Sequence, residues 1–138
     1  MKTYRCFYLG VLVMLIFTLG ACSKNNDKDL APDSLAGKMY QVVVNTGTGL
    51  FAATGTATLS FDAGGNYTTT GDANIVADNG TYTYTKVTDD TGEFQLASNV
   101  IPAFQATYVF TYTTEGAGNF TASLPATGDT QSGTFTEQ

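Results

Sequence analysis

Apolar and polar residues alternate along most of the chain after Leu35. This period of two is typical of β-strands that bury one face and expose the other. Between Phe51 and Phe61 every second residue is apolar or small, and threonine and serine fill most of the positions between them. The same alternation recurs over residues 81–85 and 107–112, again with threonine on the polar phase. Threonine suits the exposed face because its β-branched side chain favours an extended backbone.

Turn-forming residues divide this alternating region into eight runs. Clusters rich in Gly, Asn and Asp supply the positive-φ positions that tight hairpins require, as in segments 62–66, 78–80, 89–92 and 115–118. No helical periodicity of useful length follows the first 21 residues. The sequence therefore predicts strands over about residues 37–46, 51–61, 66–76, 80–87, 93–98, 105–113, 118–124 and 131–137.

Eight consecutive antiparallel strands with short hairpins predict an all-β fold, an up-and-down meander. Closing the meander into a barrel removes both exposed sheet edges, which would otherwise promote aggregation. A two-sheet β-sandwich is the alternative, favoured if residues 98–104 cross from one sheet to the other. An internal repeat accompanies the meander, because Gly-(Asn/Thr)-aromatic-Thr occurs four times, starting at Gly65, Gly80, Gly118 and Gly133.

A short apolar segment precedes this region. Lys2 and Arg5 are followed by a run without charge from Phe7 to Ala21, too short to span a hydrocarbon core of ~30 Å comfortably. The run ends in Leu19-Gly20-Ala21-Cys22, which resembles the bacterial lipobox. The resemblance implies a signal helix that is cleaved before Cys22, and a lipid attached to the Cys22 thiol. An uncleaved anchor and a buried first helix are the alternatives.

The chain therefore divides into a lipoprotein signal peptide over residues 1–21, a lipidated flexible tether over 22–34 and a β-barrel domain over 35–138. The tether is predicted because residues 23–34 are polar, charged and without periodicity. Its composition resembles that of lipoproteins of the Bacteroidetes type. We expect an outer-membrane lipoprotein of the cell envelope, either on the periplasmic face or on the cell surface.

Composition excludes several chemistries. The chain has no His, and after Cys22 it has no Arg, Trp or further Cys. Ser-His-Asp triads, Cys-His pairs and His/Cys zinc sites are therefore impossible within it. Removing Lys2 and Arg5 with the signal peptide changes the net charge from −6 to −8, which argues against a nucleic-acid partner. We expect no enzyme activity, no catalytic residues, no cofactor and no metal site.

A resemblance to a known family rests on two short segments. Leu35-Ala36-Gly37-Lys38-Met39-Tyr40 opens the first predicted strand, and Asn79-Gly80-Thr81-Tyr82 lies within the meander. Together with the meander itself, they resemble small bacterial lipocalin-like domains of the calycin group, including the MoaF-like type, over roughly residues 35–138. The resemblance implies a calycin barrel.

The interior of such a barrel is the candidate site. Eight strands enclose a space that is either filled by side chains or just large enough for one small ligand. In the second case, inward aromatic residues line a cup for an apolar or glycan-like ligand, with tyrosine hydroxyls as polar contacts. The candidate ligand-binding residues are Tyr67, Tyr82, Tyr84, Tyr108, Phe110 and Tyr112.

These observations predict a membrane-anchored, non-catalytic binding module for a small apolar or glycan-like ligand. Its partners would be the membrane, through the lipid on Cys22, and a hydrophobic ligand, a glycan or an envelope protein. Two alternatives remain open. One is a surface interaction or adhesion protein, and the other is a small-barrel protease inhibitor that uses the tether.

Overall fold

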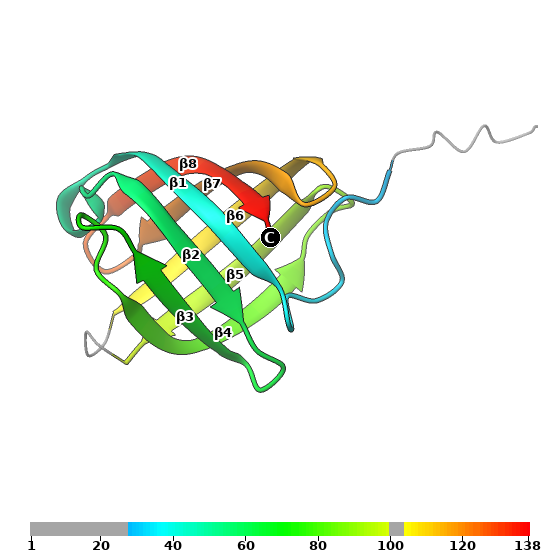
Figure 1. The fold of residues 1–138 in the computed structure, drawn as a ribbon, viewed down its shortest axis with the longest axis horizontal. Coiled ribbons are helices and arrows are strands. Elements are labelled where there is room, and N and C mark those ends of the chain that lie inside the picture. The colour runs from blue at the N-terminus through cyan, green and yellow to red at the C-terminus, as the bar shows by residue number, and fades with distance from the viewer. Residues whose placement is uncertain (1–27, 100–103) are drawn as a thin grey trace, which may run out of the picture.

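The structure, a computed structural model, describes residues 28–99 and 104–138. Eight antiparallel strands close into one barrel in which each strand pairs with its sequence neighbours and the last pairs with the first (Figure 1). The prediction of a closed up-and-down barrel is confirmed, and the two-sheet sandwich is wrong. The elements are β1 (Met39–Gly47), η1 (Gly49–Phe51, a 3-10 helix), β2 (Gly55–Phe61), β3 (Asn66–Gly71), β4 (Asp78–Lys86), β5 (Thr91–Ser98), β6 (Gln105–Thr114), β7 (Ala117–Leu124) and β8 (Asp129–Glu137).

The predicted strand boundaries differ from the observed ones mainly around β2 and β3. The strand predicted over 51–61 begins later, because its first residues belong to η1 and the turn after it. The strand predicted over 66–76 ends at Gly71, and residues 72–77 form the loop to β4. Residues 78–80, predicted as a turn, are instead the start of β4.

The Asp72 side chain explains why β3 stops early. Its carboxylate accepts hydrogen bonds from the amides of Thr56, at 2.7 Å, and Asn74, at 2.9 Å. The first bond takes up an amide of the neighbouring strand β2 and the second an amide of the loop after β3, in place of the ladder bonds that a longer strand would make. The two backbone bonds lower the pKa of the Asp72 carboxyl below its ordinary value, the bond from Thr56 contributing most.

Aromatic residues fill one half of the barrel interior. Phe110 is 1% exposed and stacks on Phe135 with ring centroids 3.9 Å apart. Tyr40 and Phe94 pack edge-on against the same ring, at 5.5 and 4.9 Å. Such edge-to-face and stacked contacts stabilise a core beyond the area that they bury.

The repeated Gly-x-aromatic-Thr segments occupy equivalent places in the barrel. All four aromatic rings lie on the inward face, three of them buried and the ring of Tyr82 half-buried. In three of the segments the glycine is also inward and buried where the neighbouring strand passes very close. A Cβ on Gly80 would clash with the carbonyl oxygen of Ala97, and one on Gly118 or Gly133 would clash with a carbonyl oxygen of its own neighbouring strand. The repeat therefore combines an aromatic ring in the core with a glycine that lets the neighbouring strand approach closely.

Residues 28–38, which we call the N-terminal strap, cover one end of the barrel. The amides of Leu30 and Ala31 both donate to the carbonyl oxygen of Asp89, at 2.7 and 2.8 Å. Ala31 and Leu35 are buried. Residues 28–34, part of the tether predicted as flexible, are thus packed against the barrel. The remaining tether residues, Cys22 and the signal peptide predicted over 1–21 lie outside the described residues.

Candidate functional site

A pocket of about 300 Å³ opens at the barrel end opposite the strap. Strand β4 illustrates the two ends, since it begins with Asp78 at the pocket and ends with Lys86 beside the strap. We call these the pocket end and the strap end. The pocket walls are mainly aliphatic and aromatic. The apolar lining residues are Val42, Val44, Leu50, Phe51, Ala53, Ala57, Leu59, Ile75, Val76, Ala77, Leu96, Phe104, Tyr108 and Phe120.

The pocket mouth carries apolar side chains that face solvent. Leu50 in η1 is 66% exposed, and Val76 in the loop between β3 and β4 is 79% exposed. Both also line the pocket. Large aliphatic residues at the mouth and along the walls give one continuous apolar surface that leads from solvent into the barrel. A small apolar molecule would bury this surface on binding.

Asp78 is the only ionisable carboxyl group that lines this pocket in the described part of the chain. The Tyr67 hydroxyl and the Ser98 hydroxyl each donate to its carboxylate at 2.6 Å. The amide of Asn79 donates to the same carboxylate at 2.8 Å. Because three donors fix the carboxylate, its negative charge has a defined place in the pocket wall.

Tyr108 supplies a second polar group to the pocket. Its ring stacks on Phe94 with centroids 5.1 Å apart, and its hydroxyl makes no hydrogen bond with any described residue. Burial raises the pKa of this hydroxyl above its ordinary value, and the nearby charge of Asp78 raises it further. The group therefore stays a neutral hydroxyl, which can donate to or accept from a ligand.

The structure separates the six predicted ligand-binding residues. Only Tyr108 lines the pocket. Phe110 and Tyr112 belong to the filled half, where the Tyr112 hydroxyl lies 3.2 Å from that of Tyr40. The other three tyrosines donate their hydroxyls within the chain: Tyr67 to Asp78, Tyr82 to the carbonyl oxygen of Asp62 and Tyr84 to that of Pro32. These five residues therefore act as core and anchoring residues in the structure.

Sequence reasoning missed Asp78 as a pocket residue. The segment Asp78-Asn79-Gly80 has the composition of a turn, and aspartate often caps backbone amides there. The alternation could have indicated its place, because Tyr84, Tyr82 and Gly80 count back in steps of two to Asp78. It also missed the aliphatic mouth, because Leu50 and Val76 lie in segments that have no alternating pattern of their own.

Two shallower hollows lie elsewhere on the barrel. One, of about 680 Å³, follows the strap and is lined by charged residues such as Lys86 and Glu115. The other, of about 330 Å³, crosses the outer face of β6, β7 and β8 and is lined mainly by hydroxyl groups. Within residues 28–99 and 104–138, no three His, Cys, Asp or Glu side chains cluster closely enough to hold a metal ion.

Comparison with known proteins adds no assignment: no family model, no curated protein and no solved structure matches this chain. In the part of the chain that the structure describes, no helix has the length and apolar character needed to cross a bilayer. The functional interpretation therefore depends on the pocket itself, on its lining and on the charges around it.

Proposed function

We propose that this chain is a lipid-anchored, non-catalytic binding protein of the cell envelope that holds a small apolar ligand. The observation that supports it most directly is the pocket of about 300 Å³ at the open end of a closed barrel. Ligand sites in proteins are typically concave, mainly apolar and about 300–1,000 Å³ in volume, with a few polar groups that orient the ligand. The pocket lies at the small end of that range, which favours a single short chain or ring system.

The architecture is compatible with the lipocalin-like resemblance, which stays part of the proposal. A closed eight-stranded barrel with one covered end and one open end is suited to holding a ligand in its interior. The filled half supplies a rigid base, and the hollow half supplies the volume. Anchoring through Cys22, on the outer membrane and on either its periplasmic or its outer face, rests on the lipobox resemblance.

The strap gives this proposal a geometric consequence. The chain enters the barrel at the strap end, because Lys28 and Asp29 lie there, beside Glu115 and Lys86. The pocket opens at the opposite end. A lipid on Cys22 would therefore direct the pocket mouth away from the bilayer. The ligand would then come from the surrounding compartment or from another protein, since the anchoring membrane lies behind the barrel.

A titration with a pocket-filling variant tests the proposed function. The sample is the chain from residue 22 onward with Cys22→Ser, so that no acyl chain competes for the pocket. We expect a polarity-sensitive apolar dye to bind saturably in a 1:1 ratio. Ala57 is buried and lines the pocket, so Ala57→Met should fill it and weaken binding about tenfold or more, equivalent to about 1.4 kcal/mol.

Thr58→Met is the matched control. Thr58 neighbours Ala57 on β2 but lies on the outward phase, so the same side chain is added outside the barrel. This variant should bind the dye as the parent does. Absence of saturable binding, or equal affinity for the Ala57→Met and parent proteins, would refute the proposed function.

The exposed mouth favours a second candidate, a surface that contacts another protein. Leu50 and Val76 are large aliphatic residues that are both exposed at the same pocket mouth, and grouped exposed apolar residues often mark interaction sites. Replacing both with serine should abolish partner binding while leaving the inner pocket unchanged. If the double variant keeps dye affinity but loses retention of an envelope partner, the mouth is an interaction surface.

A further inference from the structure

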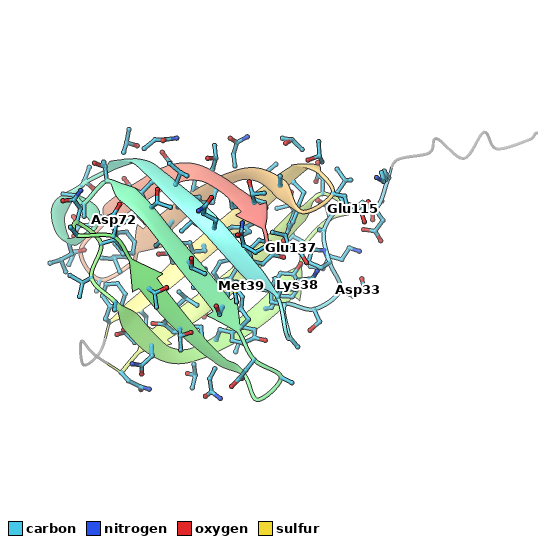
Figure 2. The ribbon with its side chains drawn as sticks, in the orientation of Figure 1. Asp33, Lys38, Met39, Asp72, Glu115 and Glu137 are labelled. Atoms are coloured by element: carbon cyan, nitrogen blue, oxygen red, sulfur yellow. The ribbon has the colours of Figure 1, made fainter. Side chains whose placement is uncertain are left out.

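The lysines among the described residues lie at one end of the barrel only, whereas carboxylates lie at both ends. All lysines among the described residues, Lys28, Lys38 and Lys86, lie at the strap end, where each pairs with a carboxylate at 2.6–3.0 Å. No basic side chain lines the pocket in the described part of the chain. Figure 2 shows Lys38, Asp33, Glu115 and Glu137 together at the strap end, with Asp72 at the other.

The pocket end carries carboxylates and no described lysine. Asp78 lies in the pocket wall, and Asp72 and Asp129 lie on neighbouring segments at the same end. Asp129 accepts a hydrogen bond from the amide of Leu50, at 3.1 Å, so its carboxylate is held beside the mouth. A ligand that enters the pocket therefore passes a negative field that no nearby lysine neutralises.

The carboxylate of Asp78 places one of these negative charges in the pocket wall. Its three donors, Tyr67, Ser98 and the Asn79 amide, leave acceptor capacity unused, because an ionised carboxylate has about four lone-pair sites. The Tyr108 hydroxyl, which has no hydrogen-bond partner among the described residues, belongs to a side chain that lines the same pocket as Asp78. An ammonium group could donate to the remaining site on Oδ2 of Asp78 and to the Tyr108 hydroxyl oxygen, whereas a carboxylate head group would meet a like charge.

From this arrangement we infer that the pocket selects apolar ligands with a cationic amine head group and rejects those with a carboxylate. The inference rests on the proposed function and names its ligand class. The alkyl or ring portion occupies the aliphatic walls, and the ammonium group lies against Asp78 and Tyr108.

Three probes with one tail and different head groups test the inference. Octylamine, octanol and octanoate are titrated below micellar concentrations into the chain from residue 22 onward with Cys22→Ser, at neutral pH and fixed salt. Amide NMR shifts give the dissociation constants. We expect octylamine to bind at least about tenfold more tightly than octanoate, with octanol between them, because opposite and like charges a few ångströms apart differ by more than this in a protein interior.

A charge-matched pair of variants separates the pocket charge from the net charge. Asp78→Asn should reduce the amine-to-acid ratio to about twofold or less, since the local charge is lost. The fold should tolerate it, because the two partner hydroxyls can rotate to accept from the new amide. Asp89→Asn removes the same charge at the strap end and keeps the backbone carbonyl that binds the strap, so it should leave the ratio unchanged.

The outcomes are distinct. Equal binding of all three probes, or tighter binding of octanoate, overturns the inference while the proposed function stands. An equal drop in the ratio for Asp89→Asn and Asp78→Asn also overturns it, because net charge would then explain the preference. If no probe and no dye binds, the proposed function fails and the inference with it. If Asp78→Asn does not fold, the relative affinities of the three probes for the Cys22→Ser chain decide whether the pocket prefers an amine head group.

Discussion

Two phenylalanines in the same barrel should respond very differently to truncation. Phe110 is 1% exposed and lies in the filled half, in contact with several other aromatic rings. Phe51 is 8% exposed and borders the pocket, with Phe104 at 5.7 Å and Tyr108 at 6.3 Å between ring centroids. Replacing each with alanine removes the same atoms, so any difference reports on the surroundings.

The expected costs follow from how each site is filled. Phe110→Ala loses the transfer free energy of the ring and also leaves a new closed cavity, which together cost about 3–5 kcal/mol in well-packed cores. Phe51→Ala loses mainly the transfer term, about 1.5–3 kcal/mol, because the vacated space merges with the existing pocket. We therefore expect Phe110→Ala to cost about 2 kcal/mol more than Phe51→Ala.

Urea unfolding followed by tyrosine fluorescence measures both costs in the Cys22→Ser chain. The slope of the free energy of unfolding against urea should be the same for both variants, so that the midpoints report stability. Phe110→Leu and Phe51→Leu repeat the comparison if an alanine variant does not fold. Equal losses of stability, or a larger loss for Phe51→Ala, would mean that the half of the barrel with the pocket is packed as tightly as the filled half. The division of the interior into a filled half and a hollow half would then be wrong.

Three further predictions concern charge and anchoring. Hydrogen bonds to Asp29 and then Asp33 raise the pKa of Lys86, so these contacts stabilise the fold fully below about pH 10, and their contribution is lost as pH rises above that value. Lys86→Met should therefore reduce the fall in melting temperature measured between about pH 10 and 12. Hydrogen bonds from Asn66, mainly from its side chain, lower the pKa of Asp62. The contribution of Asp62 to the stability of the fold is therefore present above about pH 4 and is lost on acidification. In Asp62→Asn the urea midpoint of unfolding should depend less on pH below about pH 4. Cys22→Ser should move the protein from the membrane to the soluble fraction on centrifugation of lysed cells, and unchanged membrane association would refute the lipid anchor.

The hydrophobic pattern predicts the fold well because side chains along a strand alternate between its two faces, so a few residues are enough to show which face is buried. Alternation around Leu59 and Phe110 indicates which side chains point inward, and the hairpin residues between runs give the order of the strands. Closure follows from a physical argument about exposed edges, and the pairing of β1 with β8 confirms it.

The same pattern cannot predict the position of a residue along the barrel axis. Tyr108 and Tyr112 lie on one strand and one phase, yet the first lines the pocket and the second lies in the filled half. Strand tilt and stagger decide that position, and both depend on pairings between strands. The alternation therefore predicts which residues point into the barrel. It does not predict which of them line the pocket, and of the six candidate ligand-binding residues only Tyr108 does so.

The strap escaped prediction for a related reason. Residues 28–34 are polar in composition, and a polar segment taken alone has too little apolar surface to order itself. Its order comes from long-range contacts that composition does not reveal. The Tyr84 hydroxyl donates to Pro32 at 2.7 Å, and Lys86 binds Asp29 and Asp33 at 2.6–3.0 Å.

The most direct test of the pocket is to locate a bound probe in it. A crystal of the Cys22→Ser chain grown with a bromine-tagged octylamine would reveal the probe through the anomalous signal of bromine. We expect that signal inside the barrel, between Leu59 and Phe120, with the amine beside Asp78. Bromine found only on the outer faces, or a pocket closed by the surrounding side chains, would contradict a ligand-binding barrel.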